Sequence, residues 1–482
     1  MRTFWRFTTI IFCIVFFSCT AEKQKLNVLW IVADDLGADL HCYGESQVYT
    51  PHLDRLASDG VLYNNFFTVT AVCSPSRSSL ITGMYPVSID CQQHRTQYKK
   101  ELPDDVEPIT KYFRDNGYFT FNGDYRNKDN GGKWDYNFIA ENIYDGTHWS
   151  QCPADKPFFG QIQIFFPHRP FKRDPERPID PERLEIPPYY PDHEVTRRDW
   201  ADYLEYIQLL DKAVGQVLKQ LEDDGLLSNT LVIFMGDQGR PHVRGKQFLY
   251  DGGTQTPLII RYPDGKKAGI LTDRLVSNID LAAATLNYCE IDKPSHIQGI
   301  DFLNDDSPER QYVFTMRDRR DETVDRIRAI RSKEYKYIRN FYPERPYLQF
   351  NAYKKFRYPV LTLMEVLKEQ GELNETQLLF MEDVRPAEEL YNLKSDPFEI
   401  RNLVDDSNYS QTLSVYRAAM DSCLTTYDMG KYPEDVAEIQ YADSLMKNNY
   451  AKWMKGIGLN ENTSNDIFLE YWEKYLGISE SN

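Results

Sequence analysis

Two runs of apolar residues, each followed by acidic side chains, constrain the fold of this chain most strongly. Residues 27–33 are Asn-Val-Leu-Trp-Ile-Val-Ala, and residues 230–235 repeat the pattern as Thr-Leu-Val-Ile-Phe-Met. Segments that are apolar at successive positions are typical of strands buried on both faces, as in a parallel sheet. Apolar side chains at helical spacing between residues 203 and 221 precede the second run. A helix, a short turn and a strand in this order indicate a doubly wound α/β fold.

Oxygen-bearing side chains follow both predicted strands directly. Asp34 and Asp35 follow the first strand, and Asp237 and Gln238 follow the second after one glycine. If both strands lie in one parallel sheet, these side chains meet at the edge where α/β proteins bind ligands. Three carboxylates there would repel one another unless a cation joined them, and all-oxygen ligation selects Ca²⁺ or Mg²⁺ over zinc. Either pair alone is also ordinary turn chemistry.

A cysteine lies at a predicted junction between a loop and a helix. Residues 73–77 are Cys-Ser-Pro-Ser-Arg, and Ser-Ser-Leu-Ile-Thr-Gly follows. Pro75 suits the first turn of a helix, and Ser74 is a candidate N-cap. Cys73 would then lie where a helix amino end attracts anions, and the Arg77 guanidinium suits a tetrahedral oxyanion. The alternative for a lone cysteine is a buried structural thiol.

This string resembles the signature of type I sulfatases, Cys-x-Pro-Ser-Arg with a Leu-x-x-Gly tail. Within that family the chain is most similar to heparan N-sulfatases (sulfamidases) and their bacterial relatives. The resemblance spans residues 27–403 and closes with Glu-Leu-Tyr-Asn-Leu and Asp-Pro at 389–397. It implies an alkaline-phosphatase-like α/β fold, with a large mixed, mostly parallel sheet flanked by helices. A smaller C-terminal α+β subdomain with an antiparallel sheet would follow.

The resemblance also implies the chemistry of the two motifs. Cys73 would be oxidised by a formylglycine-generating enzyme to formylglycine (3-oxoalanine), whose hydrate is the nucleophile. Residue 73 would lie at a Ca²⁺ ion, favoured over Mg²⁺, that Asp34, Asp35 and Asp237 bind. Gln238 stands where the family has Asn or His, and its longer amide would be the remaining ligand.

Further cations are implied around the leaving sulfate. His168 lies in a Pro-His pair and Lys246 in a Gly-Lys pair, as in the family. Lys133 lies in Gly-Lys-Trp-Asp, where Asp135 stands in place of the family's His. His242 lies near Lys246 in the sequence and could substitute or assist. The alternative for each isolated His or Lys is a solvated surface position.

An arginine-rich segment follows the predicted catalytic part. Residues 317–331 hold six Arg beside four acidic residues. Glu322, Arg326 and Arg328 are the candidates for contact with an acidic glycan. A salt-bridged structural hairpin explains the same segment equally well.

The amino end predicts export rather than a folded element. An apolar run at 10–17 is too short for a membrane span and suits a signal peptide. Ser18 and Cys19 follow, as in a bacterial lipoprotein whose Cys19 carries the lipid, although a secretory signal cut nearby is the alternative. We therefore expect a periplasmic protein or an outer-membrane lipoprotein. The predicted divisions are a signal at 1–19, a catalytic domain at 26–310 and a C-terminal subdomain at 311–482.

These observations predict a sulfuric ester hydrolase acting on a sulfated glycan of the glycosaminoglycan type, with heparin or heparan O- or N-sulfates as candidates. The net charge of −17 argues against nucleic acid as a partner, so a local basic pocket must attract the anionic substrate. The expected partners are a sulfated oligosaccharide and the maturation enzyme, with membrane contact only through Cys19. Two alternatives stay open: a phosphate or phosphonate ester hydrolase of the same superfamily, and a non-catalytic glycan-binding lipoprotein.

Overall fold

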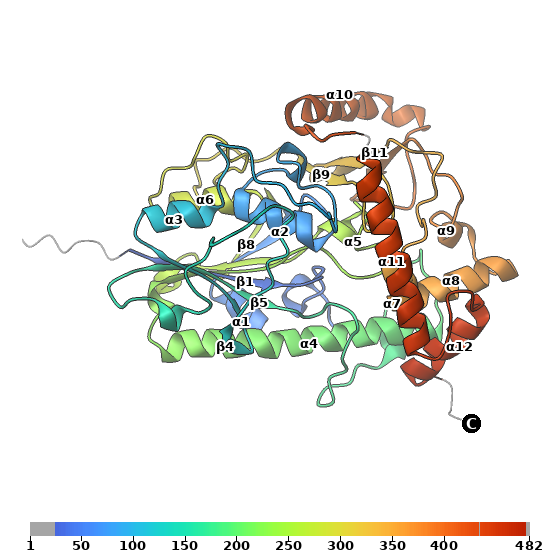
Figure 1. The fold of residues 1–482 in the computed structure, drawn as a ribbon, viewed down its shortest axis with the longest axis horizontal. Coiled ribbons are helices and arrows are strands. Elements are labelled where there is room, and N and C mark those ends of the chain that lie inside the picture. Colours follow the sequence, from blue (N-terminus) through green and yellow to red (C-terminus); the bar gives the residue numbers. More distant parts are fainter. Residues whose placement is uncertain (1–24, 433, 479–482) are drawn as a thin grey trace, which may run out of the picture.

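The computed structural model describes residues 25–432 and 434–478 (Figure 1). The predicted signal segment 1–19 and Cys19 lie outside the described residues. Across the described part, every helix is too short or too polar to cross a bilayer.

Two sheets organise the molecule. The strands are β1 (Asn27–Ala33), β2 (Val61–Phe67), β3 (Phe119–Asp124), β4 (Asn127–Gly131), β5 (Phe158–Ile164), β6 (Thr230–Gly236), β7 (Leu258–Arg261), β8 (Ile270–Ser277), β9 (Val313–Arg317), β10 (Ile327–Arg331), β11 (Tyr335–Asn340) and β12 (Glu388–Asn392). The helices are α1 (Pro51–Ser58), α2 (Cys73–Thr82), α3 (Ile109–Asp115), α4 (Glu194–Asp223), α5 (Asp251–Thr254), α6 (Asp280–Tyr288), α7 (Ala352–Arg357), α8 (Pro359–Gln370), α9 (Glu375–Leu378), α10 (Ser410–Tyr427), α11 (Val436–Gly456) and α12 (Asn465–Leu476).

The large sheet has eight strands in the order β4-β3-β5-β1-β6-β7-β2-β8. Its centre, β3-β5-β1-β6, is parallel throughout, and β2 and β8 are also parallel to each other. Strands β4 and β7 run antiparallel to their neighbours. The prediction of a large mixed, mostly parallel sheet is therefore confirmed.

Helices cover both faces of this sheet (Figure 1). The long helix α4 lies along one face, and α2, α3 and α6 lie on the other. Because side chains alternate along a strand, Leu29 and Ile31 of β1 join the core beneath α4. Val28 and Trp30 join the core on the other side. Burial on both faces explains why β1 is apolar at nearly every position.

The C-terminal part contains a four-stranded antiparallel sheet in the order β12-β11-β10-β9. Helix α10 packs on this sheet through Leu413, Tyr416 and Met420. Helices α11 and α12 contact α7 and α8 beside one end of α4 (Figure 1). The predicted antiparallel C-terminal sheet is confirmed, whereas the division at residues 310 and 311 stays a prediction.

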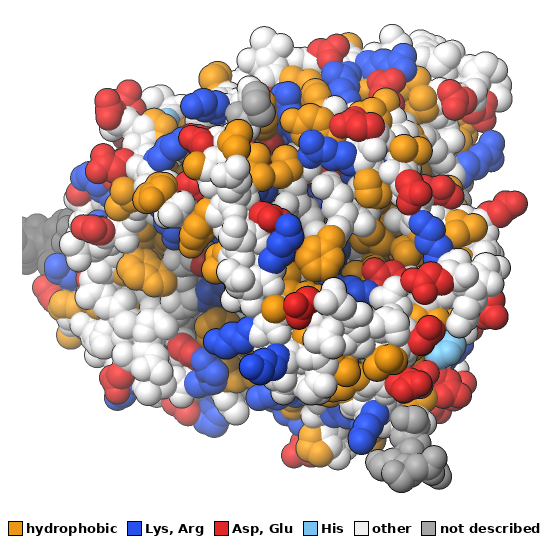
Figure 2. Space-filling model, turned by 45° about the vertical axis from the view of Figure 1, so that its right-hand side comes forward, with side chains coloured by type: hydrophobic (Ala, Val, Ile, Leu, Met, Phe, Trp, Pro, Cys, Tyr) orange, Lys and Arg blue, Asp and Glu red, His pale blue; other side chains and the backbone are white. Residues whose placement is uncertain are grey.

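The surface carries mixed charge on the face drawn in Figure 2, where acidic, basic and apolar side chains are interspersed. The chain's excess of 73 acidic over 56 basic residues therefore leaves room for local basic pockets.

Candidate active site

Two neighbouring parallel strands place the predicted ligands together. Strands β1 and β6 pair in register, with Ala33 opposite Gly236 at their carboxyl ends. The backbone N–H of Asp237 continues this ladder by donating to the Ala33 carbonyl at 2.9 Å. Asp34 and Asp237 therefore leave the sheet side by side.

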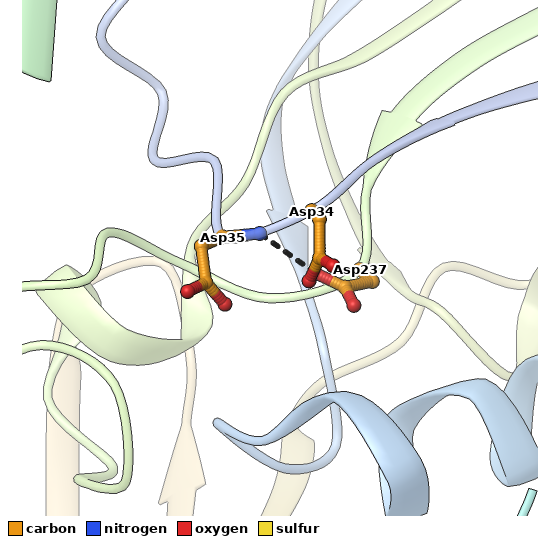
Figure 3. Close-up of side chains that lie close together, drawn as sticks. All are labelled: Asp34, Asp35 and Asp237. Carbon is orange, nitrogen blue, oxygen red and sulfur yellow. Dashed lines mark hydrogen bonds between the residues drawn. The ribbon is translucent and has the colours of Figure 1, made fainter. Parts of the chain in front are cut away.

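Three buried carboxylates form a compact cluster at this edge. One oxygen each of Asp34, Asp35 and Asp237 lies within 4.8 Å of the others (Figure 3). The Asp35 N–H donates to Asp237 Oδ1 at 3.0 Å, the dashed line in Figure 3. Asp35 adopts a left-handed conformation with φ of 64°, which turns its side chain toward the cluster. Backbone strain of this kind gathers at functional sites.

The cluster has the features of a cation site. Asp34 Oδ1 and Gln238 Oε1 are buried without a hydrogen-bond partner in the described part of the chain. Burial and the neighbouring Asp34 raise the pKa of Asp237 to about 7, because two adjacent carboxylates resist simultaneous ionisation. An all-oxygen set of this kind fits a hard cation such as Ca²⁺. The Gln238 amide nitrogen contacts Asp35, so its role as a ligand stays a prediction.

Three basic side chains neutralise the cluster from different segments. Lys133 Nζ lies 2.8 Å from Asp34 Oδ2, and Lys246 Nζ lies 2.7 and 2.8 Å from the two Asp35 oxygens. The Arg77 guanidinium contacts Asp237 Oδ2 through Nε at 3.0 Å and Nη2 at 2.9 Å.

These cations change the titration of Asp34. Burial alone would raise the pKa of Asp34, but Lys133 and Arg77 hold it well below its usual range. The site thus combines negative charge for a metal with positive charge for a substrate oxyanion.

His168 lies at the edge of this arrangement. Its Nε2 is 3.7 Å from Asp35 Oδ2 and 3.5 Å from the Tyr353 hydroxyl. Its Nδ1 lies 2.7 Å from the Arg169 carbonyl, an acceptor, so Nδ1 carries the proton. Burial lowers the pKa of His168. The ring is therefore oriented with Nε2 toward the carboxylates.

Cys73 is the first residue of α2 and is 6% exposed. The N-cap is Val72 rather than the predicted Ser74, because the Val72 carbonyl accepts the first helical bond from the Ser76 N–H at 3.1 Å. Pro75 lies in the first turn, as predicted. Burial, followed by the Asp135 carboxylate, raises the pKa of the Cys73 thiol to about 12. A thiol at this position is therefore protonated and a weak nucleophile at neutral pH.

Asp135 belongs to the site, although the sequence marked it only as a departure from a motif. Its carboxylate lies 3.7 Å from Arg77 Nε and 3.9 Å from Lys133 Nζ, and it contacts the Cys73 side chain. Burial would raise the pKa of Asp135, but Lys133 and Arg77 keep it below its ordinary value. Its spacing of two residues from Lys133 was the available signal, since alternate residues of an extended segment share a side.

The structure does not bring His242 to the cluster. Its ring packs between Trp200 and Tyr203, with centroid distances of 4.3 and 4.8 Å. The nearest carboxylate is Asp199 at 3.9 Å, and burial lowers the pKa of His242 well below its ordinary value. The same turn that directs Lys246 to the carboxylates directs His242 into the core, so a catalytic role for His242 is not supported.

The predicted glycan contacts also need correction. Arg328 is wholly buried, with ion pairs to Asp318 at 3.1 Å and Asp428 at 3.0 Å. Arg326 pairs with Asp428 at 3.0 Å and stacks on the Tyr432 ring at 3.9 Å. A wholly buried, paired guanidinium cannot reach a glycan, so the salt-bridged hairpin describes Arg328 better, whereas the Arg326 side chain is 23% exposed and its contact with a glycan stays a prediction.

Glu322 has a structural partner as well. Its carboxylate accepts the Ala352 N–H at 2.5 Å at the start of α7, and burial raises the pKa of Glu322 to about 7. The contact of Glu322 with a glycan therefore stays a prediction.

Comparison with known sequences gives a consistent picture. Residues 26–291 match the sulfatase family, and residues 241–355 match the C-terminal domain of N-sulphoglucosamine sulphohydrolase. An ulvan-active sulfatase of Formosa agariphila is 34% identical over 466 residues, covering 85% of this chain and 77% of the relative. Human N-sulphoglucosamine sulphohydrolase is 27% identical over 467 residues, covering 83% and 89%.

Solved structures share the fold. One similar protein, in complex with its substrate D-glucosamine-2-N,6-O-disulfate, superposes with a TM-score of 0.60 at 18% identity, covering 84% of this chain and 98% of that one. Phosphonate monoester hydrolase of Agrobacterium radiobacter gives a TM-score of 0.63 at 18% identity, covering 84% and 96%. The predicted alkaline-phosphatase-like fold is thereby confirmed.

Proposed function

Because the chain belongs to the sulfatase family and is a sulfuric ester hydrolase, we propose that it releases sulfate from a sulfated glycan. The proposal includes formylglycine made from Cys73 and a Ca²⁺ ion held by the three clustered carboxylates. The observation that carries it is the meeting of those carboxylates with Arg77, Lys133 and Lys246 around the amino end of α2.

The raised pKa of the Cys73 thiol makes the unmodified side chain a weak nucleophile at neutral pH, so modification would supply a nucleophile that the site otherwise lacks. Formylglycine at residue 73 would supply a hydrated aldehyde, with one hydroxyl suited to act as the nucleophile and a second that would permit release of the sulfate. An unmodified cysteine has no such second group and would remain sulfated.

The chain's basic residues would hold the sulfate group. Arg77 is fixed by two contacts with Asp237, so its fork is oriented before substrate arrives. Lys133 and Lys246 reach the same region from separate loops. When bound, Ca²⁺ would add positive charge where the sulfate oxygens gather. Preorganised positive charge stabilises the transition state more than the same groups would in water.

Two side chains suit the proton transfers. Asp135 contacts residue 73 and is held ionised by its basic neighbours, so it can accept a proton from the nucleophile. Asp237 suits this role less, because its oxygens already accept bonds from Arg77 and the Asp35 N–H. His168 presents Nε2 toward the site, and its imidazolium form, with a proton on both ring nitrogens, is the form that can protonate the departing sugar oxygen.

The similarity to relatives supports a set of substrates for a first test. Ulvan and heparin-type saccharides are proposed because an ulvan-active sulfatase and N-sulphoglucosamine sulphohydrolase are similar over most of this chain. An exported location, with Cys19 as a lipid anchor, is part of the proposal and rests on residues 10–19 alone.

The test is sulfate release by protein produced with the maturation enzyme. Ulvan oligosaccharides and heparin disaccharides are incubated with the protein, and free sulfate is measured by ion chromatography. We expect release by the wild type and none by Cys73→Ala. Turnover of an aryl phosphate or phosphonate faster than the matched aryl sulfate would favour the alternative hydrolase. Binding without any release would favour the non-catalytic lipoprotein.

A further inference from the structure

The segment 240–246 faces two different sites. Lys246 points to the carboxylate cluster, whereas Arg240 and Arg244 line a separate cavity of about 310 Å³. Ala38, Gly252 and the turn after β12 complete its wall, and neither Cys73 nor any clustered carboxylate lines it. The cavity is therefore distinct from the candidate active site.

Basic side chains dominate the lining. They are Arg240, Arg244, Arg331, Lys333 and Lys394, against the two acids Asp251 and Glu399. Both acids are already paired from beneath by the buried Lys336, at 2.5 and 2.7 Å. Arg331 also pairs with Asp251 at 3.2 Å and Arg240 pairs with Asp39 at 2.6 Å, so an anionic ligand would depend most on the lining cation that has no such pair, Arg244.

Arg244 is the least compensated of these cations. It is 7% exposed, and no carboxylate lies within ion-pair distance of it in residues 25–432 and 434–478. Its Nη1 donates to the Phe398 carbonyl at 2.8 Å, and its Nη2 donates to the Glu399 carbonyl. Its Nε has no partner in the described structure. A buried guanidinium without a counter-ion is costly, so an anion in the cavity would complete its environment.

Aromatic rings give the cavity a second property. The Arg244 guanidinium stacks on Tyr250 at 4.0 Å and on Tyr189 at 4.7 Å. Phe398, which also lines the cavity, is 44% exposed. Tyr189 and Tyr250 are buried, so Phe398 offers the exposed ring, and an exposed ring beside an Arg fork suits a ligand with both an apolar face and an oxyanion. A sulfated or carboxylated sugar has this combination.

We propose that this basic pocket is a non-catalytic site that binds one anionic sugar unit of a polysaccharide. Its volume lies at the small end of the range for ligand pockets, about 300–1,000 Å³, which suits a single sugar unit. Lys333 and Lys394 form its exposed rim, since their side chains are 44% and 68% exposed in pairs with Glu309 and Glu334. The proposal goes beyond sulfate hydrolysis and rests on the proposed function only for the class of ligand.

The test uses Cys73→Ala protein, so that no ligand is consumed. Its migration is measured by affinity electrophoresis in gels containing heparin and in gels containing ulvan. We expect Lys333→Ala/Lys394→Ala to weaken binding to at least one polysaccharide by about fivefold or more, equivalent to about 1 kcal/mol. Arg244→Gln should weaken polysaccharide binding by a similar factor, provided that its melting temperature stays near that of the parent protein. With Cys73 intact, the double lysine variant should hydrolyse a sulfated monosaccharide at the wild-type rate.

The matched control is Lys219→Ala/Lys447→Ala. It also removes two exposed lysines, each paired with an aspartate four residues along a helix, and it should leave binding unchanged. Equal weakening in the control and pocket variants, or no weakening in the pocket variant, would overturn the proposal. It would also fail if inorganic sulfate stabilises the parent but not Arg244→Gln while neither polysaccharide binds. Pocket-dependent binding without sulfate release from any substrate would instead contradict the proposed function alone.

Discussion

At the scale of the residue, the candidate site depends on which side chains share one small volume with Cys73. The carboxylates of β1 and β6 were predictable because strand pairing fixes their positions. The directions of Asp135, His242 and Arg328 were not, because loop conformation and tertiary ion pairs set them. Motif similarity indicated Lys133 and Lys246, and the structure places both in contact with the cluster.

Replacing Asp135 tests its role at the nucleophile. We expect Asp135→Asn to lower kcat by about 10²–10⁴-fold, with a smaller change in KM, because the amide cannot accept the proton. Steady-state kinetics on a sulfated disaccharide measures this, and mass spectrometry checks that residue 73 is still modified. Asp129→Asn, at an exposed position in β4, is the control. A kcat within about twofold of wild type, below 0.5 kcal/mol, would exclude Asp135 as the base.

Arg328 belongs to the same scale, but its effect is on stability. We expect Arg328→Ala to reduce the free energy of unfolding by about 3–5 kcal/mol, because it leaves Asp318 buried without its ion-pair partner and removes one of the two arginines that pair with Asp428. Urea denaturation measures this change. Arg401→Ala, which breaks an exposed pair with Asp406, should cost less than about 1 kcal/mol. If Arg328→Ala loses activity but keeps the stability of the wild type, the result would instead support the prediction that Arg328 contacts the glycan directly.

At the scale of the element, the buried strands and the amphipathic helix α4 were predictable from periodicity alone. The contact between α1 and α4 was not, because it depends on one buried acid. Asp211 of α4 accepts the Leu53 N–H at 2.8 Å and the His52 N–H at 3.3 Å at the start of α1. Burial raises the pKa of Asp211 to about 7. The spacing of residues in the sequence does not show that a carboxylate of α4 is buried against the first N–H groups of α1.

This shift gives a pH dependence for the contact of α1 with α4. In the unfolded chain Asp211 has an ordinary pKa near 3.9, so between about pH 4 and 7 the folded state binds more protons. Linkage then makes the Asp211 contribution to stability fall as pH rises through this window. Asp211→Asn removes the titration while keeping an acceptor, so its unfolding free energy should decline less over that window. Parallel pH profiles for wild type and Asp211→Asn would contradict this assignment.

At the scale of the whole molecule, two sheets and their covering helices bring distant segments to one edge. The large sheet, the acidic cluster at its edge and the second sheet were predictable from pattern and resemblance. The basic pocket on the other side of segment 240–246 could not be predicted from the sequence. The cations that line this pocket come partly from the loop between β6 and α5 and partly from the strands of the C-terminal sheet and the turns after them. Only the docking of the two sheets creates it.

The proposed metal binding would depend on this whole arrangement. We expect Ca²⁺ at about 100 times its dissociation constant to stabilise the protein by about 2.7 kcal/mol, because the unfolded chain does not hold the three carboxylates together. Thermal melts with Ca²⁺ and with a chelator measure the shift. Asp34→Asn should abolish the Ca²⁺-dependent shift, and Asp145→Asn, at a position away from the cluster, should retain it. An unchanged shift in Asp34→Asn would place the ion elsewhere.

The most direct test of the account is the mass of the tryptic peptide that contains residue 73, taken from protein that releases sulfate. Our account predicts the mass of formylglycine in the active preparation. It also predicts the mass of cysteine, with no turnover, in protein made without the maturation enzyme. An active preparation whose peptide carries an unmodified cysteine would contradict it.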